Sequence, residues 1–469
     1  MSKTYTIRCK GVNERFNGTF IFNNSKFEAP GLLPGEKAKV SLLYGKDKGK
    51  AVVEEILEPS EHRVAPFCQA YALCGGCALQ HTDYENSLKI KTQVVKDLIG
   101  GFVKVEDCVG AEKPLNYRNK INATLAKNKR GQVISGLYME SSHKVIRLNE
   151  CAIENKNAAA VMGSIRQFMN DYHIEPFNED KQTGILRHVL FRVAASGDTL
   201  VVLVSGNKIF PEKNKLAQAI SEKHGFVKSV VLNYNLKKTS MILGDRDEIL
   251  TGAGHVTDTM CGICFRISAH SFYQVNTPMA ERLYTDAIKG AGLTKNDRIL
   301  DAYCGIGTIT SVAAKISGAK EVTGVELNAS AVRDAKENAA SAGLGNLRFV
   351  CSDAGDFLRK AADDGDHYSC VIMDPPRAGS SDKFLRALTK MAPEKVIYIS
   401  CNPVALAHDL KILTRFGYRA VKATPYDMFP WTGNVETVVQ LINQNANAKH
   451  HVEIGIDAEE YYKIKECVL

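Results

Sequence analysis

Cys401 is the residue whose setting in this sequence most directly favours covalent chemistry. It follows the apolar run VIYIS and opens the sequence CNP, so the thiol is expected just beyond the end of a strand. A free thiol has a pKa of roughly 8.5, and even a small thiolate fraction is a strong nucleophile. A cysteine at a strand end can also be a small core residue, and the residue types alone leave both interpretations open.

A glycine-containing segment, RILDAYCGIGTIT, predicts a ligand-binding loop between a strand and a helix. Gly305 and Gly307 let backbone approach a ligand closely. The next strand ends at Glu326, 19 residues after Gly307, where such folds place a carboxylate for ribose hydroxyls. Thr310 stands where a dinucleotide fingerprint has a third glycine, so S-adenosylmethionine fits better than NAD. A tight turn beside a surface glutamate is the alternative interpretation.

Two further carboxylates repeat this arrangement. Asp353 follows the third strand of this part of the chain and Asp374 the fourth, so both are predicted at the edge that carries the glycine loop. The sequence DPPR, residues 374–377, resembles the DPPY-type motif of enzymes that methylate exocyclic amines. An aromatic residue stacks on the target base in those enzymes, and Arg377 stands there instead, which argues against an amine substrate.

Three cysteines lie close together in CQAYALCGGC, at positions 68, 74 and 77. The N-terminus MSKTYTIRCK has no secretory signal, so the 13 cysteines are expected in a reducing compartment and not in disulfides. The spacing of Cys68, Cys74 and Cys77 predicts a metal or cluster site that lacks one ligand, and both iron–sulfur and zinc chemistry use thiolates. The candidates for the fourth ligand are Cys108, Cys151 and the Cys261/Cys264 pair. That pair interrupts a predicted hairpin, so we interpret it as structural.

The elements that must position these residues follow from the periodicity of each segment. Residues 1–62 alternate short β-type runs with turn residues, which predicts a small β-barrel. Residues 63–265 mix helix and strand patterns, and the runs HVLFRVA and TLVVLVS are expected to pair as a hairpin. From residue 266 to 445 strands alternate with amphipathic helices, which predicts a doubly wound parallel sheet. Residues 446–469 are a polar linker and a short acidic tail, to which we assign no function.

Six motifs occur in order across residues 271–438: SFYQVN, DAYCGIG, GVELN, DPPRAG, ISCNP and GNVETV. Together they resemble the TRAM-containing RNA uracil-5-methyltransferase family, and the similarity extends over residues 1–445. The stretch GLLPGEKAKVSL also resembles the TRAM module, an oligonucleotide-binding-like barrel. The resemblance implies a multidomain α/β protein. Its parts would be a TRAM barrel, a mixed α+β central domain that binds RNA and a cysteine-held cluster, and a Rossmann-like methyltransferase domain.

The resemblance also implies the roles of individual residues. Cys401 would be the nucleophile and Glu436 the general base. Carbon 5 of uracil is too weakly nucleophilic to take a methyl group from a sulfonium directly, so thiolate addition at carbon 6 must activate the ring, and a base must then remove the proton at carbon 5. The residues assigned to the cofactor site by resemblance are Gln274, Tyr303, Glu326 and Asp374, to which the sequence pattern adds Gly305, Gly307 and Asp353.

The resemblance also implies a role for the cysteines, and at one position the chain departs from the family. The fourth cysteine ligand would be Cys151, in RLNECAI, and the group held would be a 4Fe-4S cluster, with zinc as the alternative. The family commonly has His before the Val-Glu pair, whereas this chain has Asn434, so the surroundings of the base differ from the family pattern.

The charge distribution bears on the partner. The chain carries a net charge of +8, and Lys113, Arg118, Lys120, Lys127, Lys129 and Arg130 follow one another without an intervening acid. This run is compatible with RNA or with an ordinary solvated face. The resemblance implies RNA, with 23S rRNA favoured and tRNA as the alternative. No apolar run approaches the roughly 20 residues of a membrane span, so we expect a cytoplasmic protein, for which a monomer is compatible.

Three other functions are less compatible with the sequence. Radical methylthiotransferases also join a TRAM module to a cysteine cluster, but they resemble a CxxxCxxC pattern on a barrel. RNA cytosine-5-methyltransferases commonly have a second cysteine in a Pro-Cys motif, where this chain has DPPR. A non-catalytic RNA-binding protein would explain the barrel and the basic run, but neither the glycine loop nor Cys401.

Overall fold

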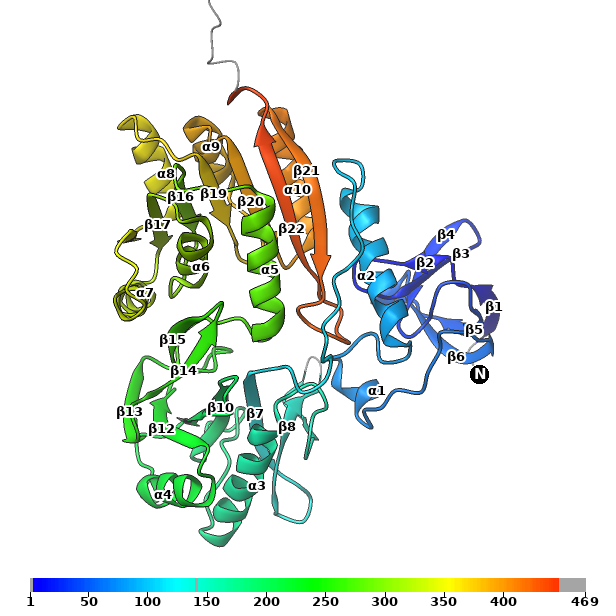
Figure 1. Ribbon diagram of the computed structural model, residues 1–469. Helices are drawn as coiled ribbons and strands as arrows, with labels where there is room; N and C mark the ends of the chain where they lie inside the picture. Colours follow the sequence, from blue (N-terminus) through cyan, green and yellow to red (C-terminus); the bar gives the residue numbers. More distant parts are fainter. Residues whose placement is uncertain (1–2, 140–141, 447–469) are drawn as a thin grey trace, which may run out of the picture.

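The computed structural model describes residues 3–139 and 142–446. The predicted linker and acidic tail lie outside the described residues, apart from Ala446. Figure 1 shows a small N-terminal β unit (blue), a central α/β part (cyan to green) and a C-terminal α/β part (green to red), with α2 running between the first and the last. None of the helices in the described ranges is long and apolar enough to span a membrane.

The N-terminal segment is an all-β unit of two three-stranded antiparallel sheets, with strand orders β1-β5-β6 and β2-β3-β4. Its elements are β1 (Thr4–Arg8), β2 (Gly11–Val12), β3 (Gly18–Phe22), β4 (Ser25–Ala29), β5 (Lys37–Leu42), the 3-10 helix η1 (Gly45–Asp47) and β6 (Ala51–Glu58). A bridge between Glu28 and Lys50 links the two sheets. Ile7, Phe20 and Val40 share one small core, so the alternating pattern of the sequence corresponds to strands with one buried face.

Two helices follow, α1 (Tyr71–Cys74) and α2 (Tyr84–Ile99). Helix α2 begins where the Asp83 side chain accepts a hydrogen bond from the Asn86 amide, a standard N-cap. Its apolar residues Ile90, Val94 and Ile99 lie in the same core as residues of the C-terminal sheet and of α10. Helix α2 therefore packs against the C-terminal part, although the sequence places it some 300 residues earlier (Figure 1).

The central part is built on a seven-stranded sheet with the order β13-β12-β11-β10-β7-β8-β9. Its elements are β7 (Lys120–Lys127), β8 (Val133–Tyr138), β9 (Val145–Arg147), α3 (Lys156–Asp171), β10 (Leu186–Val193), β11 (Thr199–Ser205), α4 (Lys213–Lys223), β12 (Val227–Tyr234) and β13 (Arg246–Thr251). Strands β10 and β11 pair antiparallel, so the predicted hairpin is confirmed. Apolar residues of α3 and α4 share a core with alternate residues of the sheet.

A separate hairpin, β14 (His255–Met260) and β15 (Ile263–Ser268), connects the central part to the C-terminal part. Cys261 and Gly262 form its two-residue turn with positive φ values of 51° and 68°, as a type I′ turn requires. The structural interpretation of the CxxC spacing agrees with this hairpin, and the cysteines that the structure describes are free thiols. The predicted domain boundary between residues 265 and 266 falls inside β15.

The C-terminal part is a seven-stranded sheet with the order β18-β17-β16-β19-β20-β22-β21. Its elements are α5 (Thr277–Gly290), β16 (Arg298–Ala302), α6 (Thr308–Ser317), β17 (Glu321–Glu326), α7 (Ala329–Ser341), β18 (Leu347–Cys351), α8 (Ala354–Asp363), β19 (Cys370–Met373), α9 (Asp382–Met391), β20 (Lys395–Ser400), α10 (Pro403–Arg415), β21 (Tyr418–Tyr426) and β22 (Glu436–Asn443). The first five strands are parallel, and β22 runs antiparallel to both neighbours. Successive residues of β16 enter different cores: Ile299 lies in one and Leu300 in the other, as in a sheet covered on both faces. The predicted doubly wound sheet is confirmed.

Candidate active site

The order of the strands brings the predicted site residues to one edge. The sheet reverses its winding between β16 and β19, and ligands of such sheets bind beyond the carboxyl ends of the strands there. Asp374 directly follows β19, and Cys401 directly follows β20. Strand β22 begins at Glu436 and pairs antiparallel with β20 so that Thr437 lies opposite Ser400. This register places Glu436 beside Cys401 although 34 residues separate them.

The glycine loop is fastened to Glu326. Gly305 and Gly307 have φ values of 55° and 79°, which favour glycine, and Gly307 is the N-cap of α6. The Glu326 carboxylate accepts hydrogen bonds from the Gly305 amide at 3.1 Å and from the Asn328 amide at 2.8 Å. A Cβ at Gly305 would meet no atom within 4 Å, whereas one at Gly307 would lie 2.8 Å from the Phe349 ring. Open space therefore lies over Gly305, while Gly307 is required by packing.

Asp301, in the strand before this loop, was not singled out by the sequence analysis, although it belongs to the DAYCGIG motif. Its side chain is fully buried, and its Oδ2 accepts a 2.6 Å hydrogen bond from the Thr310 hydroxyl. Its Oδ1 has no hydrogen-bond partner among the described residues. Burial raises the pKa of Asp301 to about 7. A buried oxygen without a partner fits a ligand that donates hydrogen bonds, as S-adenosylmethionine does through its amino and ribose groups.

Two other residues predicted for the cofactor site, Tyr303 and Gln274, each lie beside an aromatic side chain. Tyr303 has a positive φ of 71°, is half-buried, and packs against Phe384 with ring centroids 5.2 Å apart. Gln274 is buried, and its side chain hydrogen-bonds the buried Tyr284, whose pKa is raised by burial and by the nearby Asp374. Tyr284 is thus a second residue of this region that was not predicted from a motif.

Asp353 lies in a different setting. It is exposed and caps α8, accepting a hydrogen bond from the Asp356 amide at 3.0 Å. Its carboxylate also pairs with Lys383 at 3.4 Å. The cap accounts for an acid at this position without a ligand, so its assignment to the cofactor site stays a prediction.

Cys401 is surrounded by charged groups that influence its reactivity. Burial, followed by the Glu436 and Asp374 carboxylates, raises the pKa of its thiol to about 12, while Arg377 opposes them. Burial also raises the pKa of Asp374 to about 7. Glu436 is only 4% exposed, and its pKa is raised well above the usual range by burial and by Asp374. The Oε2 atom of Glu436 has no partner among the described residues, so the carboxylate is free to accept a proton.

The four predicted cluster ligands approach one another without forming a metal site. Burial raises the pKa of Cys77 to about 11, with smaller contributions from Cys74 and Cys68. Cys151 has its pKa raised to about 12 by burial, and Cys77 is among its neighbours, which distinguishes it from Cys108. However, the described residues contain no group of three or more His, Cys, Asp or Glu arranged to hold a metal ion. The predicted 4Fe-4S or zinc site is therefore unsupported by the arrangement of these thiols.

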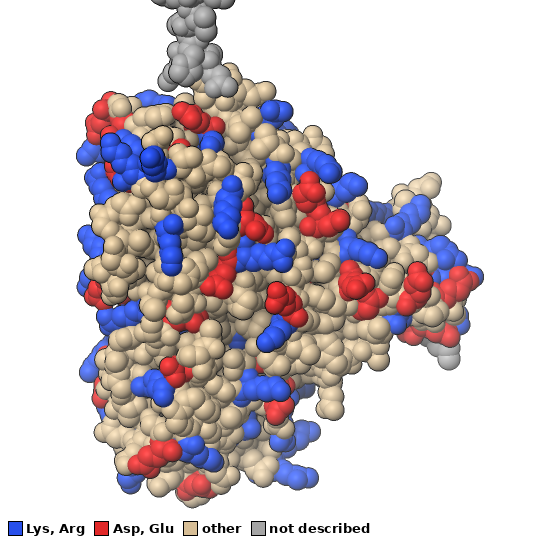
Figure 2. All heavy atoms as spheres, in the orientation of Figure 1, with Lys and Arg blue, Asp and Glu red and all other residues tan. Residues whose placement is uncertain are grey.

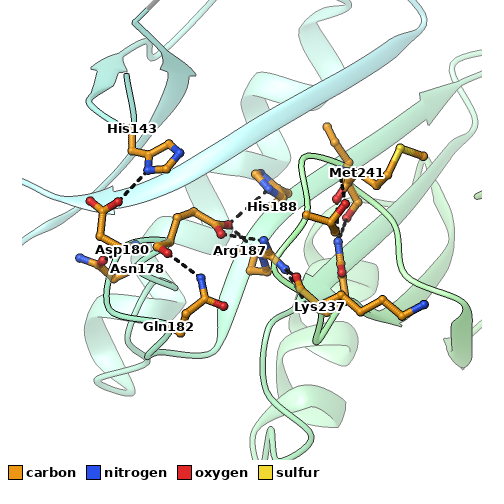
Figure 3. A network of polar contacts seen from close by, with 12 residues as sticks. His143, Asn178, Asp180, Gln182, Arg187, His188, Lys237 and Met241 are labelled. Carbon is orange, nitrogen blue, oxygen red and sulfur yellow. Dashed lines mark hydrogen bonds and ion pairs between the residues drawn. The ribbon is translucent and has the colours of Figure 1, made fainter. Parts of the chain in front are cut away.

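A cavity of about 620 Å³ lies elsewhere, in the central part beside β7, β8 and the loop before β10. Two of the acids that line it are paired: Asp180 with His143 at 2.9 Å, and Glu179 with Arg187, which does not itself line the cavity, at 2.7 Å (Figure 3). None of the predicted catalytic, cofactor or cysteine residues lines it. The cavity is thus separate from the edge of the C-terminal sheet.

Comparison with known proteins agrees with this geometry. The family model described as tRNA (uracil-5-)-methyltransferase matches residues 83–444. The chain belongs to this family. It is 36% identical over 446 residues to an uncharacterized RNA methyltransferase of Halalkalibacterium halodurans, covering 93% of this chain and 95% of the relative. It is 39% identical over 430 residues to another from Caldanaerobacter subterraneus, covering 90% and 93%.

A solved structure shows the same fold. The chain superimposes on the Pyrococcus abyssi tRNA (uracil-54, C5)-methyltransferase in complex with S-adenosyl-L-homocysteine with a TM-score of 0.74 and 24% identity. The match covers 93% of this chain and 100% of the other. By its family and its relatives, this chain is therefore an RNA methyltransferase.

Proposed function

We propose that this chain methylates carbon 5 of a uridine in RNA, with Cys401 as the nucleophile and Glu436 as the general base. The observation that carries the proposal is the register of β20 against β22, which puts the Cys401 thiol beside a buried carboxylate whose Oε2 has no partner among the described residues. Addition chemistry at uracil needs this pair of groups.

The proposed reaction balances as follows. The Cys401 thiolate forms a bond to carbon 6, and the electron pair of the carbon 5–carbon 6 double bond moves toward the carbon 4 carbonyl as an enolate. S-adenosylmethionine, when bound, supplies an electrophilic methyl group for carbon 5. Glu436 then removes the proton from carbon 5, the double bond re-forms, and the thiolate leaves. Its raised pKa makes the Glu436 carboxylate a stronger proton acceptor than an exposed one.

The cofactor would be held by the residues around the glycine loop. Glu326, already bonded to the Gly305 amide, lies where a ribose is bound in such sheets, and Asp301 is near enough to Glu326 and Asp374 for both carboxylates to raise its pKa. Gln274, Tyr303 and Asp374 are proposed to complete this site.

For the target RNA we propose 23S rRNA, supported by the N-terminal β unit and the cysteine-rich segment, with tRNA as the second candidate. The tRNA candidate is favoured by the description of the matching family and by the substrate of the Pyrococcus abyssi enzyme. On the face in Figure 2, basic and acidic side chains are interspersed, so charge alone does not select one RNA. Mass mapping of 5-methyluridine in RNA from a deletion strain would identify the site; loss confined to tRNA would refute the rRNA proposal.

The catalytic proposal is tested by two substitutions. Cys401→Ala should retain cofactor binding but lose methyl transfer and covalent RNA adducts, whereas Cys264→Ala, at an exposed thiol on β15, should behave as the unsubstituted protein. Glu436→Gln should hold methylated RNA covalently on Cys401. Full activity of Cys401→Ala, or rapid product release by Glu436→Gln, would contradict the assignment.

The cluster is a separate proposal that rests on the four cysteine positions and on the family resemblance. Anaerobic purification followed by iron and sulfide analysis tests it directly. About four iron atoms per chain are expected for a 4Fe-4S cluster; stoichiometric zinc without iron would replace it by the zinc alternative.

A further inference from the structure

Lys91 of helix α2 is a fully buried lysine that reaches the loop preceding Glu436. It is 0% exposed, and its ammonium group donates to Asp427 Oδ1 at 2.5 Å, Phe429 O at 3.0 Å and Asn434 O at 2.7 Å. These bonds use all three donors of the group. Each acceptor lies between β21 and β22, so a single side chain fixes both ends of that connection.

The connection between β21 and β22 contains an unfavourable backbone conformation and is held by contacts from residues 78–91. Trp431 within it has a φ of 69°, which is unfavourable for a residue other than glycine. The Trp431 carbonyl accepts hydrogen bonds from the Ala78 and Leu79 amides, and the Tyr84 hydroxyl donates to Asp427 Oδ2 at 2.8 Å. All of these contacts come from residues 78–91, so a segment outside the C-terminal sheet holds the loop in place.

Asn434, which stands where the family commonly has His, connects the loop that Lys91 contacts to Arg377. Its side-chain Oδ1 accepts a 2.8 Å hydrogen bond from Arg377 Nη2. The Arg377 carbonyl in turn accepts a 2.8 Å bond from the side chain of Asn402, the neighbour of Cys401. Arg377 thus joins the segment that carries the base to the segment that carries the nucleophile.

The charge of Arg377 acts on both groups. It lowers the pKa of Cys401 and that of Glu436, against the effect of burial on each. A displacement of the guanidinium would leave the thiol harder to ionise. The position of Arg377 therefore matters for the reaction, and Asn434 is the side chain that its Nη2 contacts.

We propose that Lys91 is a positioning residue for methyl transfer, acting through Asn434 and Arg377 to hold the nucleophile and base segments in register. The inference rests on the function proposed above for Cys401 and Glu436. In this proposal a residue of helix α2 influences the reaction, although Cys401 and Glu436 both lie on the C-terminal sheet.

The test compares full-length variants on bulk RNA from a strain that lacks the gene. Lys91→Met/Asp427→Asn removes the buried charges together, which avoids leaving one uncompensated. Its turnover number should fall about tenfold while KM for RNA and cofactor affinity change less than about threefold, because ground-state binding is unaffected. Lys96→Met, which removes an exposed charge from the same helix, should leave turnover unchanged.

Asn434→Ala supplies a variant that does not disturb the buried pair, and the same fall in turnover is expected. Because Lys91 acts through Asn434, combining all three substitutions should reduce turnover by no more than about twofold beyond Asn434→Ala alone. Unchanged turnover in Asn434→Ala, or effects that multiply in the combined variant, would overturn the proposal. Activity in Cys401→Ala would instead refute the proposed function, so the two failures are distinguishable.

Discussion

The rate at which Cys401 adds to RNA should depend steeply on pH. The pKa of its thiol is raised from 9.0 to about 12, first by burial and then by Glu436 and Asp374. At pH 8 the thiolate fraction of a group with this pKa is about one in ten thousand, against roughly one in ten for a pKa of 9. Because the pKa is raised, the thiolate fraction grows about tenfold with each pH unit throughout the range from 7 to 9.

Glu436→Gln is the informative perturbation of this dependence. It removes a carboxylate that raises the pKa of Cys401, so the thiol should ionise more readily. A change of one unit, typical of a nearby charge, would speed adduct formation about tenfold at each pH. The same variant should release product slowly, because the proton at carbon 5 has lost its acceptor. Asp382→Asn, at an exposed acid at the start of α9, serves as the charge control.

The assay is rapid quenching of enzyme and S-adenosylmethionine with RNA containing 5-fluorouridine, followed by denaturing gels that retain the covalent complex. Fluorine at carbon 5 cannot leave as a proton, so the adduct accumulates and its first appearance is measured. A plateau below pH 8 would show that the thiol is not strongly perturbed. Slower addition in Glu436→Gln would show that Glu436 deprotonates Cys401, which would refute the reasoning.

Three further predictions concern the cofactor edge. Gly305→Ala and its control Gly343→Ala both place Ala at a positive φ in open space, so each should cost about 1 kcal/mol of stability. Only Gly305→Ala should weaken S-adenosylmethionine binding, as measured by calorimetry. Glu326→Gln should weaken that binding about tenfold and lower the melting temperature only slightly, because the single amide oxygen can accept from only one of the Gly305 and Asn328 amides and one of the two backbone bonds is lost. Thr310→Val removes the hydrogen bond that the Thr310 hydroxyl donates to Asp301, whose pKa of about 7 means that it is ionised at pH 8 and protonated at pH 5. The loss of stability, about 1–3 kcal/mol, should therefore be larger at pH 8 than at pH 5 in thermal unfolding. An equal loss of stability at both pH values would contradict the raised pKa.

The predicted positions of Cys401 and Asp374 agree with the structure because both residues follow strand ends, while their roles stay predictions. Once VIYIS is a strand of a parallel sheet, Cys401 must lie at its carboxyl edge, and the register of β22 adds Glu436 beside it. Asp353 shows the weakness of the same logic, because a carboxylate after a strand is equally suited to cap the next helix. The cysteine spacing likewise predicted neighbours but not a ligand geometry.

Periodicity and short-range spacing fix strand ends and turns, so the doubly wound sheet, the glycine loop and the ordered motifs could be predicted from the residues alone. Which charges become buried could not be predicted in this way. Lys91 lies 336 residues before Asp427. Helical spacing puts Lys91 on the same face as Val94 and Val95, unlike the exposed lysines of this helix, but it does not identify the carboxylate that pairs with it. Its ammonium group is buried, and reaches its three acceptors, only because α2 packs against the loop that precedes Glu436. The partner that satisfies a buried charge is set by packing between distant segments, which no local pattern encodes.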